Sequence, residues 1–298
     1  MLNIALVTNK KLHHKFWSSQ LYENHNVKLI IHPSSKSKNL KDKIFGSKNF
    51  LWSVLKILSI FYNKFSSSSF SKQLERGQES YFKEYEKEYL KIDKHIIHNV
   101  NSVNDPSTIQ LFKNNNIDVI CFLGGDIVKK IFFDSLDALC LNFHSGISPF
   151  YNGNKTVFQA VSDFRPNFAG GTLMKMNEKL DGGAILSHYL TPIRKKDNAA
   201  DLFLKGIIGS VKLYSDALSN IDLVKNGGVT QERSFKYVRN LDWTILNDVR
   251  LNNFYKSNKL KIYIREEEIL LYYNVNNIQE LYSKSLFKIL GKSKKNAK

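Results

Sequence analysis

The sequence predicts an α/β fold with a central, mostly parallel β-sheet and a small C-terminal appendage. Short apolar runs typical of strands alternate with helix-length segments through about residue 220. The chain of 298 residues is 42% hydrophobic and 12% aromatic, a globular composition that can supply a sizeable core. We expect a main domain over residues 1–228, with a helical insertion near 40–75, and a small region over 229–298.

The N-terminal residues predict a βαβ unit. A strand is expected over 3–7 and another over 27–32, where β-branched and aliphatic residues dominate. The segment between them has the length of a helix and places Phe16, Trp17 and Leu21 on one side. No G-x-G-x-x-G sequence follows the first strand, so the dinucleotide-binding fingerprint is absent there.

The insertion contains a helix that is apolar almost all round. Residues 50–62 carry few polar side chains and are too short to cross a bilayer. Lysines flank them at positions 41, 43, 48 and 64. We favour a helix docked on the rest of the fold or on a second subunit. The alternative is a helix that lies on an anionic membrane, with Trp52 and the lysines as anchors.

The remaining elements follow the same alternation. Residues 66–69, all serine, are expected to form a flexible joint, and residues 73–94 an amphipathic helix or a pair of helices. Further strands are expected over 96–100, 117–123, 138–141, 169–176 and 184–191, and helices over 107–114, 128–133, 156–163 and 199–218. After residue 228 we expect a helix near 244–254, a strand pair over 259–265 and 269–274, and a disordered basic tail.

Charge and cysteine content narrow the class of protein. The net charge of +17 fits a biased base composition, but also a nucleic acid, an anionic membrane or a phosphate-bearing substrate as partner. Cys121 and Cys140 lie in apolar runs, which indicates buried side chains without a disulfide or a metal site. No signal peptide is evident, so we expect a cytoplasmic protein, with the inner face of the membrane left open.

Two polar side chains end a buried strand in the middle of the chain. Asn142 and His144 follow the apolar run 138–141 and precede a Gly/Pro-rich turn. On a strand, an i, i+2 pair lies on one face about 7 Å apart, and strand ends are where open α/β sheets bind ligands. Taken alone, the pair has an alternative interpretation as a turn cap and an ordinary loop histidine. Gly124 and Gly125 end the preceding strand and would let a flat ligand approach the backbone.

Three motifs together resemble the N10-formyltetrahydrofolate-dependent formyltransferases. They are Asn142-Phe143-His144, then Pro149-Phe150-Tyr151-Asn152-Gly153, then Leu180-Asp181-Gly182-Gly183. His144 and Asp181 are 37 positions apart, which fits the family spacing. The resemblance is good over residues 110–192 and loose over the rest of the first 220. The chain departs from the family pattern at Asn152, where many members carry arginine, and at Gly146, where serine is common.

The resemblance implies a Rossmann-like formyltransferase core, N10-formyltetrahydrofolate as co-substrate, no metal, and a set of site residues. The catalytic residues would be Asn142, His144 and Asp181. The folate would lie against Leu123, Gly124, Gly125, Asp126, Ile127, Asn177 and Leu180, and the acceptor against Ser145, Tyr151, Asn152 and Gly153. The residue types suit the chemistry, because a tetrahedral oxyanion needs a hydrogen-bond donor and a histidine supported by a carboxylate can move the amine proton.

The acceptor is not fixed by the resemblance. We favour a nucleotide-linked amino sugar used in surface glycan synthesis, as for lipopolysaccharide. A methionyl-tRNA formyltransferase would explain the basic charge, but the roughly 68 residues after Thr230 are few for its C-terminal barrel. A non-catalytic, partner-binding relative is a third alternative. A homodimer and a peripheral membrane contact through residues 40–65 also stay open.

Overall fold

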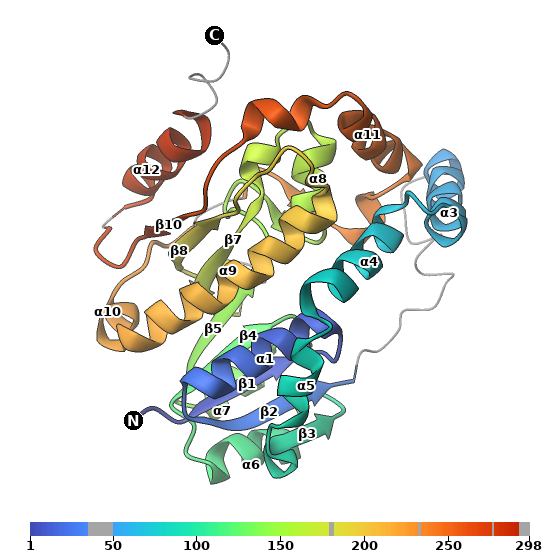
Figure 1. Ribbon diagram of the computed structural model, residues 1–298. Coiled ribbons are helices and arrows are strands. Elements are labelled where there is room, and N and C mark those ends of the chain that lie inside the picture. Colours follow the sequence, from blue (N-terminus) through green and yellow to red (C-terminus); the bar gives the residue numbers. More distant parts are fainter. Residues whose placement is uncertain (35–49, 179–181, 232–233, 276, 292–298) are drawn as a thin grey trace.

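The protein has an α/β architecture in which helices pack on both sides of one large sheet (Figure 1). The computed structural model describes residues 1–34, 50–178, 182–231, 234–275 and 277–291. The expected tail after residue 291, the lysines at 41, 43 and 48, Leu180 and Asp181 lie outside the described residues.

The main sheet has eight strands in the order β10-β8-β7-β5-β4-β1-β2-β3. Their bounds are β1 Ile4–Thr8, β2 Val27–Pro33, β3 Ile97–Val100, β4 Val119–Leu123, β5 Leu139–His144, β7 Gly170–Lys175, β8 Ile185–Leu190 and β10 Glu268–Leu271. Strands β3, β2, β1, β4 and β5 are parallel, whereas β7 and β10 run antiparallel to their neighbours. The predicted mostly parallel sheet is therefore confirmed. A second sheet pairs β6 (Asn152–Gly153) with β9 (Tyr237–Val238).

The α-helices of the described residues lie where the sequence predicts helices, except for those over 221–226 and 278–291, which it does not predict. The α-helices are α1 Leu12–Asn24, α3 Phe50–Phe65, α4 Phe70–Phe82, α5 Tyr85–Leu90, α6 Pro106–Asn114, α7 Lys130–Ser135, α8 Thr156–Ser162, α9 Ala199–Ser219, α10 Ile221–Asn226, α11 Ile245–Lys256 and α12 Ile278–Gly291. Helix α9 begins with a capping box, in which the Asn198 side chain accepts from the backbone N–H of Asp201 and the Asp201 carboxylate accepts from that of Asn198. Trp17 of α1 and Tyr214 of α9 pack edge to face in the core between these helices and the sheet.

The serine run and the charged segment after it form ordered local structure. Ser69 accepts a hydrogen bond from the backbone N–H of Lys72 (3.4 Å) and caps α4. Residues 73–94 contribute to two helices, α4 and α5, rather than one. Both cysteines are buried and free, as predicted from their apolar surroundings.

The predicted C-terminal hairpin is wrong. Residues Lys259–Tyr263 form a 3-10 helix, and only the second strand, β10, forms. It pairs antiparallel with β8 and extends the main sheet. The side chain of Arg265 explains the difference, because its buried guanidinium donates to three backbone carbonyls at the end of the sheet: Thr191 (2.8 Å), Asn167 (2.6 Å) and Ala169.

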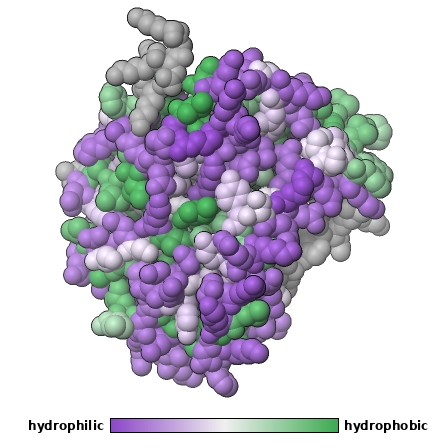
Figure 2. All heavy atoms as spheres, viewed as in Figure 1, coloured by the Kyte–Doolittle hydropathy of each residue, from purple (hydrophilic) through white to green (hydrophobic). Residues whose placement is uncertain are grey.

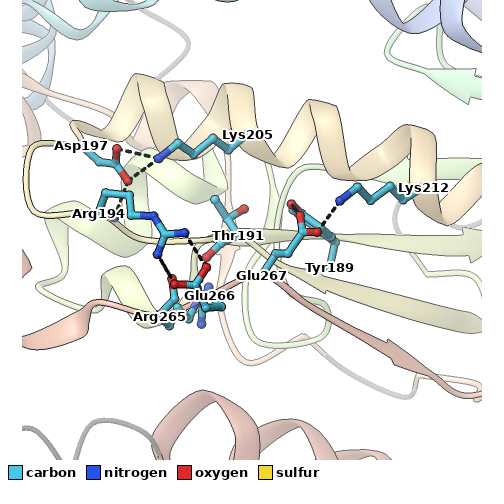
Figure 3. Close-up of polar contacts among 9 residues, drawn as sticks. All are labelled: Tyr189, Thr191, Arg194, Asp197, Lys205, Lys212, Arg265, Glu266 and Glu267. Atoms are coloured by element: carbon cyan, nitrogen blue, oxygen red, sulfur yellow. Dashed lines mark hydrogen bonds and ion pairs between the residues drawn. The ribbon is translucent and has the colours of Figure 1, made fainter.

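Two ion pairs reinforce this junction (Figure 3). Arg194 binds Glu266, and Lys212 binds Glu267, which also accepts a hydrogen bond from Tyr189 (2.5 Å). The three contacts join the segment before β10 to β8, to the loop after β8 and to α9. A hairpin folded on itself would have left the Arg265 guanidinium without these acceptors, and an unsatisfied buried charge is costly.

We expect Arg265→Met to lower the free energy of unfolding by about 3 kcal/mol or more, because three buried carbonyls lose their donor. The matched variant Arg194→Met removes an exposed ion pair and should cost less than about 1 kcal/mol. Urea denaturation followed by circular dichroism measures both. Equal losses for the two variants would contradict the anchoring role of Arg265.

Candidate active site

A cleft of about 460 Å³ opens at the C-terminal ends of β4 and β5. Ten of the residues predicted for the site line it: Leu123, Gly124, Gly125, Asp126, Ile127, Asn142, His144, Ser145, Gly153 and Asn177. The sheet order brings them together, since β4 and β5 are parallel neighbours and end at the same edge. Such an edge is where open α/β sheets bind ligands.

Strand β5 delivers the amide and the imidazole to the cleft. It extends beyond the apolar run through His144, because Asn142 and His144 pair with Met174 and Thr172 of β7. Phe143, between them, is buried in the core on the opposite face. Its ring lies against Gly171, where a Cβ atom would be 2.0 Å from Phe143 Cζ. The two-residue period of the strand thus separates a core side chain from two cleft side chains.

The His144 ring is buried and oriented by the loop that follows. Its Nε2 lies 3.1 Å from the carbonyl oxygen of Tyr151. A carbonyl can only accept, so Nε2 carries the hydrogen and donates it, and the basic nitrogen of the neutral ring is Nδ1. Gly146 belongs to this arrangement. A Cβ atom there would lie 2.6 Å from the same Tyr151 oxygen.

Gly124 and Gly125 give the cleft a wall of bare backbone. Both have positive φ values, +71° and +100°, which residues other than glycine rarely adopt. A Cβ atom at Gly124 would lie 3.1 Å from Asn9 Nδ2 and 3.3 Å from His14 Cε1. Because Gly124 has no side chain, the backbone beside Asn9 and His14 stays open in the cleft. A Cβ atom at Gly125 would instead meet Val7 and Pro33, which do not line the cleft.

Two residues expected on the acceptor side do not line the cleft. The Tyr151 hydroxyl donates to Asp163 Oδ2 (3.1 Å), and burial raises the pKa of Tyr151. The Asn152 side-chain amide donates to Gln231 Oε1 (3.3 Å), and the Gln231 amide donates to the Gly183 carbonyl (2.8 Å). Both side chains thus join elements of the fold. Tyr151 contributes to the site only through its backbone carbonyl, which accepts the hydrogen bond from His144.

The cleft is also lined by residues that the sequence did not point to. They include Asn9, His13, His14, Phe203 and Tyr237. The two histidines start α1, directly after the end of β1, which is the neighbour of β4 in the sheet. The available signal was a pair of histidines just after a strand at the ligand-binding edge. It pointed to this cleft only once β1 was known to lie beside β4.

Hydrogen bonds fix the tautomers of these histidines. Thr8 Oγ1 donates to the Leu123 carbonyl (2.9 Å), so His14 Nδ1, 2.7 Å away, must donate to the same hydroxyl. His13 Nδ1 donates to Gln78 Oε1 (2.8 Å). Burial lowers the pKa of His13 to about 4 and that of His14 well below its ordinary value. Both rings are therefore neutral near pH 7, with Nε2 as hydrogen-bond acceptor.

Buried neutral histidines make the stability depend on pH. Burial lowers the pKa of His13 to about 4 and that of His188 to about 3, whereas the unfolded chain binds these protons near pH 6.5. Below pH 6.5 the unfolded state therefore holds more protons than the folded state. The stability is complete above that pH and declines as the pH falls toward 4, by up to about 1.4 kcal/mol per pH unit for each histidine.

Urea denaturation between pH 7 and pH 4 tests this expectation. In His13→Gln the decline should be shallower, since glutamine does not titrate. In His95→Gln, a change at an exposed histidine, it should match the original chain. A slope that His13→Gln leaves unaltered would contradict the role of burial.

Known proteins share both sequence and fold with this chain. A sequence model of the formyl transferase family matches residues 27–218. The chain is 32% identical over 134 residues to a methionyl-tRNA formyltransferase from Lysinibacillus sphaericus, which is 42% of each protein. It is 30% identical over 125 residues to one from Borrelia hermsii, covering 42% of this chain and 40% of that protein. The chain thus matches less than half the length of these relatives.

The structural comparison extends over more of the molecule. The fold matches a sugar N-formyltransferase from a Shewanella species with a TM-score of 0.52 at 14% identity, covering 85% of this chain and 88% of that one. The family match covers most of the chain, and the large α/β sheet is the fold of this solved relative. The chain therefore belongs to the formyl transferase family.

Proposed function

We propose that the protein transfers a formyl group from N10-formyltetrahydrofolate to the amine of a nucleotide-linked amino sugar. One observation carries this proposal: Asn142 and His144 of β5 lie in the same cleft as Gly124 and Gly125, which follow the neighbouring strand β4 and carry no side chains. A donor, a base and a flat ligand wall are the parts that formyl transfer requires.

In this proposal each side chain has one task. As the acceptor amine bonds to the formyl carbon, the formyl oxygen becomes an oxyanion, to which the Asn142 amide donates a hydrogen bond. His144 takes the amine proton and returns a proton to the departing nitrogen of the folate. Asp181 would stabilise the charged imidazolium. Since Asp181 lies outside the described residues, its part rests on the resemblance alone.

Two observations favour a sugar over a tRNA. The Shewanella sugar N-formyltransferase matches over most of both chains. The described C-terminal residues add β10 to the main sheet rather than a separate barrel. The methionyl-tRNA relatives and the net charge of +17 favour the second candidate, an aminoacylated tRNA.

An acceptor panel tests the proposal. The protein is incubated with N10-formyltetrahydrofolate and either nucleotide-linked amino sugars or methionylated tRNA, and the formylated product is detected by mass. Turnover of a sugar is the expected result. Turnover of tRNA alone, with binding that weakens steeply as salt rises, would favour the second candidate. No turnover with either class would favour a non-catalytic relative.

A further inference from the structure

Helix α3 turns its polar side chains toward the protein. Ser59 Oγ donates to Asp248 Oδ2 of α11 (2.6 Å), and Asn63 Nδ2 lies 3.2 Å from the same oxygen. Lys56 Nζ donates to the carbonyl of Trp243 (2.7 Å). A surface helix ordinarily buries its apolar face and exposes its polar one. In α3 the contacts to α11 are largely polar, and the arrangement is reversed.

The opposite side of α3 is an exposed apolar face. Its residues recur at three- and four-residue intervals, as one stripe of a helix requires. They are Phe50, Leu51, Val54, Leu58, Phe61 and Phe65, and five of them are 48–85% exposed (Val54 is half-buried). Figure 2 shows the patch as green spheres over α3 at the right-hand edge. Contiguous exposed apolar patches of this kind mark interaction surfaces.

The exposed charges that α3 and α11 carry are positive. Helix α3 contains no acidic residue, and the one acid of α11, Asp248, is 2% exposed and points inward. Lys64 Nζ lies 5.2 Å from the centre of the Phe65 ring. Arg250 and Lys256 of α11 are exposed as well, and Lys256 borders the same cavity as Tyr62 of α3. Every exposed charge on this pair of helices, within the described residues, is therefore a cation.

The basic character continues into a neighbouring cavity. Tyr62 of α3 and Val249 of α11 border a cavity of about 680 Å³. Its lining includes the cations Arg76, Lys195, Lys196 and Lys256. The acid in this lining, Asp197, is paired with Lys205 (2.7 Å). The apolar face and the basic groups thus form one continuous surface.

We propose that this surface docks on an anionic lipid bilayer. The phenylalanines and leucines of α3 enter the boundary of the acyl chains, and the surrounding cations contact anionic head groups. No helix in the described part of the chain is long and apolar enough to cross a membrane, so α3 lies along the surface. A second copy fits less well. Pairing two such faces would oppose like charges, and no acid on α3 is available to complement them.

Vesicle co-sedimentation of the full chain tests this docking. We expect binding to mixed phosphatidylglycerol–phosphatidylcholine vesicles, weaker binding to pure phosphatidylcholine, and loss of the difference at high salt. The double variant Phe61→Ser/Phe65→Ser should bind at least about tenfold more weakly. The control Phe287→Ser changes a phenylalanine that is 73% exposed on α12, distant from α3 in Figure 1, and should bind as the original chain does.

A second pair of variants separates charge from apolar contact. Lys64→Gln/Lys256→Gln should lower the affinity for mixed vesicles several-fold and leave the affinity for pure phosphatidylcholine unchanged. Lys113→Gln on α6 is the control. Formyl transfer in solution and the thermal unfolding curve should be unchanged in all of these variants. A wrong acceptor assignment would therefore show in the formylation assay, whereas a wrong docking proposal would show in vesicle binding.

Two results would overturn the proposal. One is equal vesicle binding by the original chain and the Phe61→Ser/Phe65→Ser variant. The other is an original chain that binds no vesicles but sediments as a dimer, which the same variant converts to a monomer. That outcome would assign the apolar face to a second copy.

Discussion

Replacing His144 with alanine is expected to reduce formyl transfer about 10²- to 10⁴-fold, the range for loss of a general acid–base group. The ring is buried, and the Tyr151 carbonyl fixes its tautomer, so that Nδ1 is the basic nitrogen of the neutral form. Single-turnover formylation at saturating acceptor measures the chemical step directly. The fall should appear in kcat, with little change in KM, because the proton moves only during the reaction.

His95→Ala is the matched control for this prediction. His95 is exposed in the turn before β3 and does not line the cleft. Its variant should retain the original rate. Thermal unfolding of both variants separates a catalytic loss from misfolding. A His144→Ala protein that is folded and transfers formyl groups at the original rate would remove His144 from the mechanism.

Replacing Asn142 with alanine is expected to lower kcat about 10²- to 10³-fold, as for removal of one oxyanion donor. Asn142→Asp keeps the shape of the side chain but places a negative charge where the oxyanion forms. Its kcat should therefore be no higher than that of Asn142→Ala. Cys140→Ala is the control on the same strand. It alters the same face of β5 two residues earlier, outside the cleft, and should leave kcat unchanged.

The pH profile of kcat provides an independent check on Asn142. The amide does not titrate, so Asn142→Ala should reduce the rate by the same factor at every pH. A profile that changes shape in Asn142→Ala would mean that the amide acts by tuning His144 rather than by contacting the oxyanion. That result would reassign Asn142 as a positioning residue.

Local patterns in the sequence predicted most of the elements. The strands β1, β4 and β5 follow from apolar runs that end at polar residues or glycine, and α9 follows from its apolar spacing. These signals depend on neighbours within a few positions, which sequence patterns record. The residues that the hairpin prediction placed at 259–265 also have strand-like composition. The guanidinium of Arg265, however, finds its acceptors about 70 to 100 positions away.

The site was predicted only in part. Asn142, His144, Gly124 and Gly125 lie at strand ends, which is where the sequence predicted ligand binding. The part of the cleft that His13 and His14 line depends on β1 lying beside β4. The Thr8 hydroxyl that orients His14 donates to Leu123, 115 positions further along the chain. Such a pairing is decided by which strands pack together, and no local pattern reports it.

The sequence by itself determined the α/β class, the family resemblance and the placement of Asn142 beside His144, because the two-residue period of a strand is a local property. Only the tertiary structure decided that His13 and His14 complete the cleft and that Asn152 faces Gln231. It also decided which face of α3 is exposed to solvent. The spacing of its apolar residues predicts a helix with an apolar stripe. Whether that stripe is buried depends on the surface against which the helix packs. Here α11 presents the carboxylate of Asp248, which binds the polar face of α3, so the apolar stripe stays exposed.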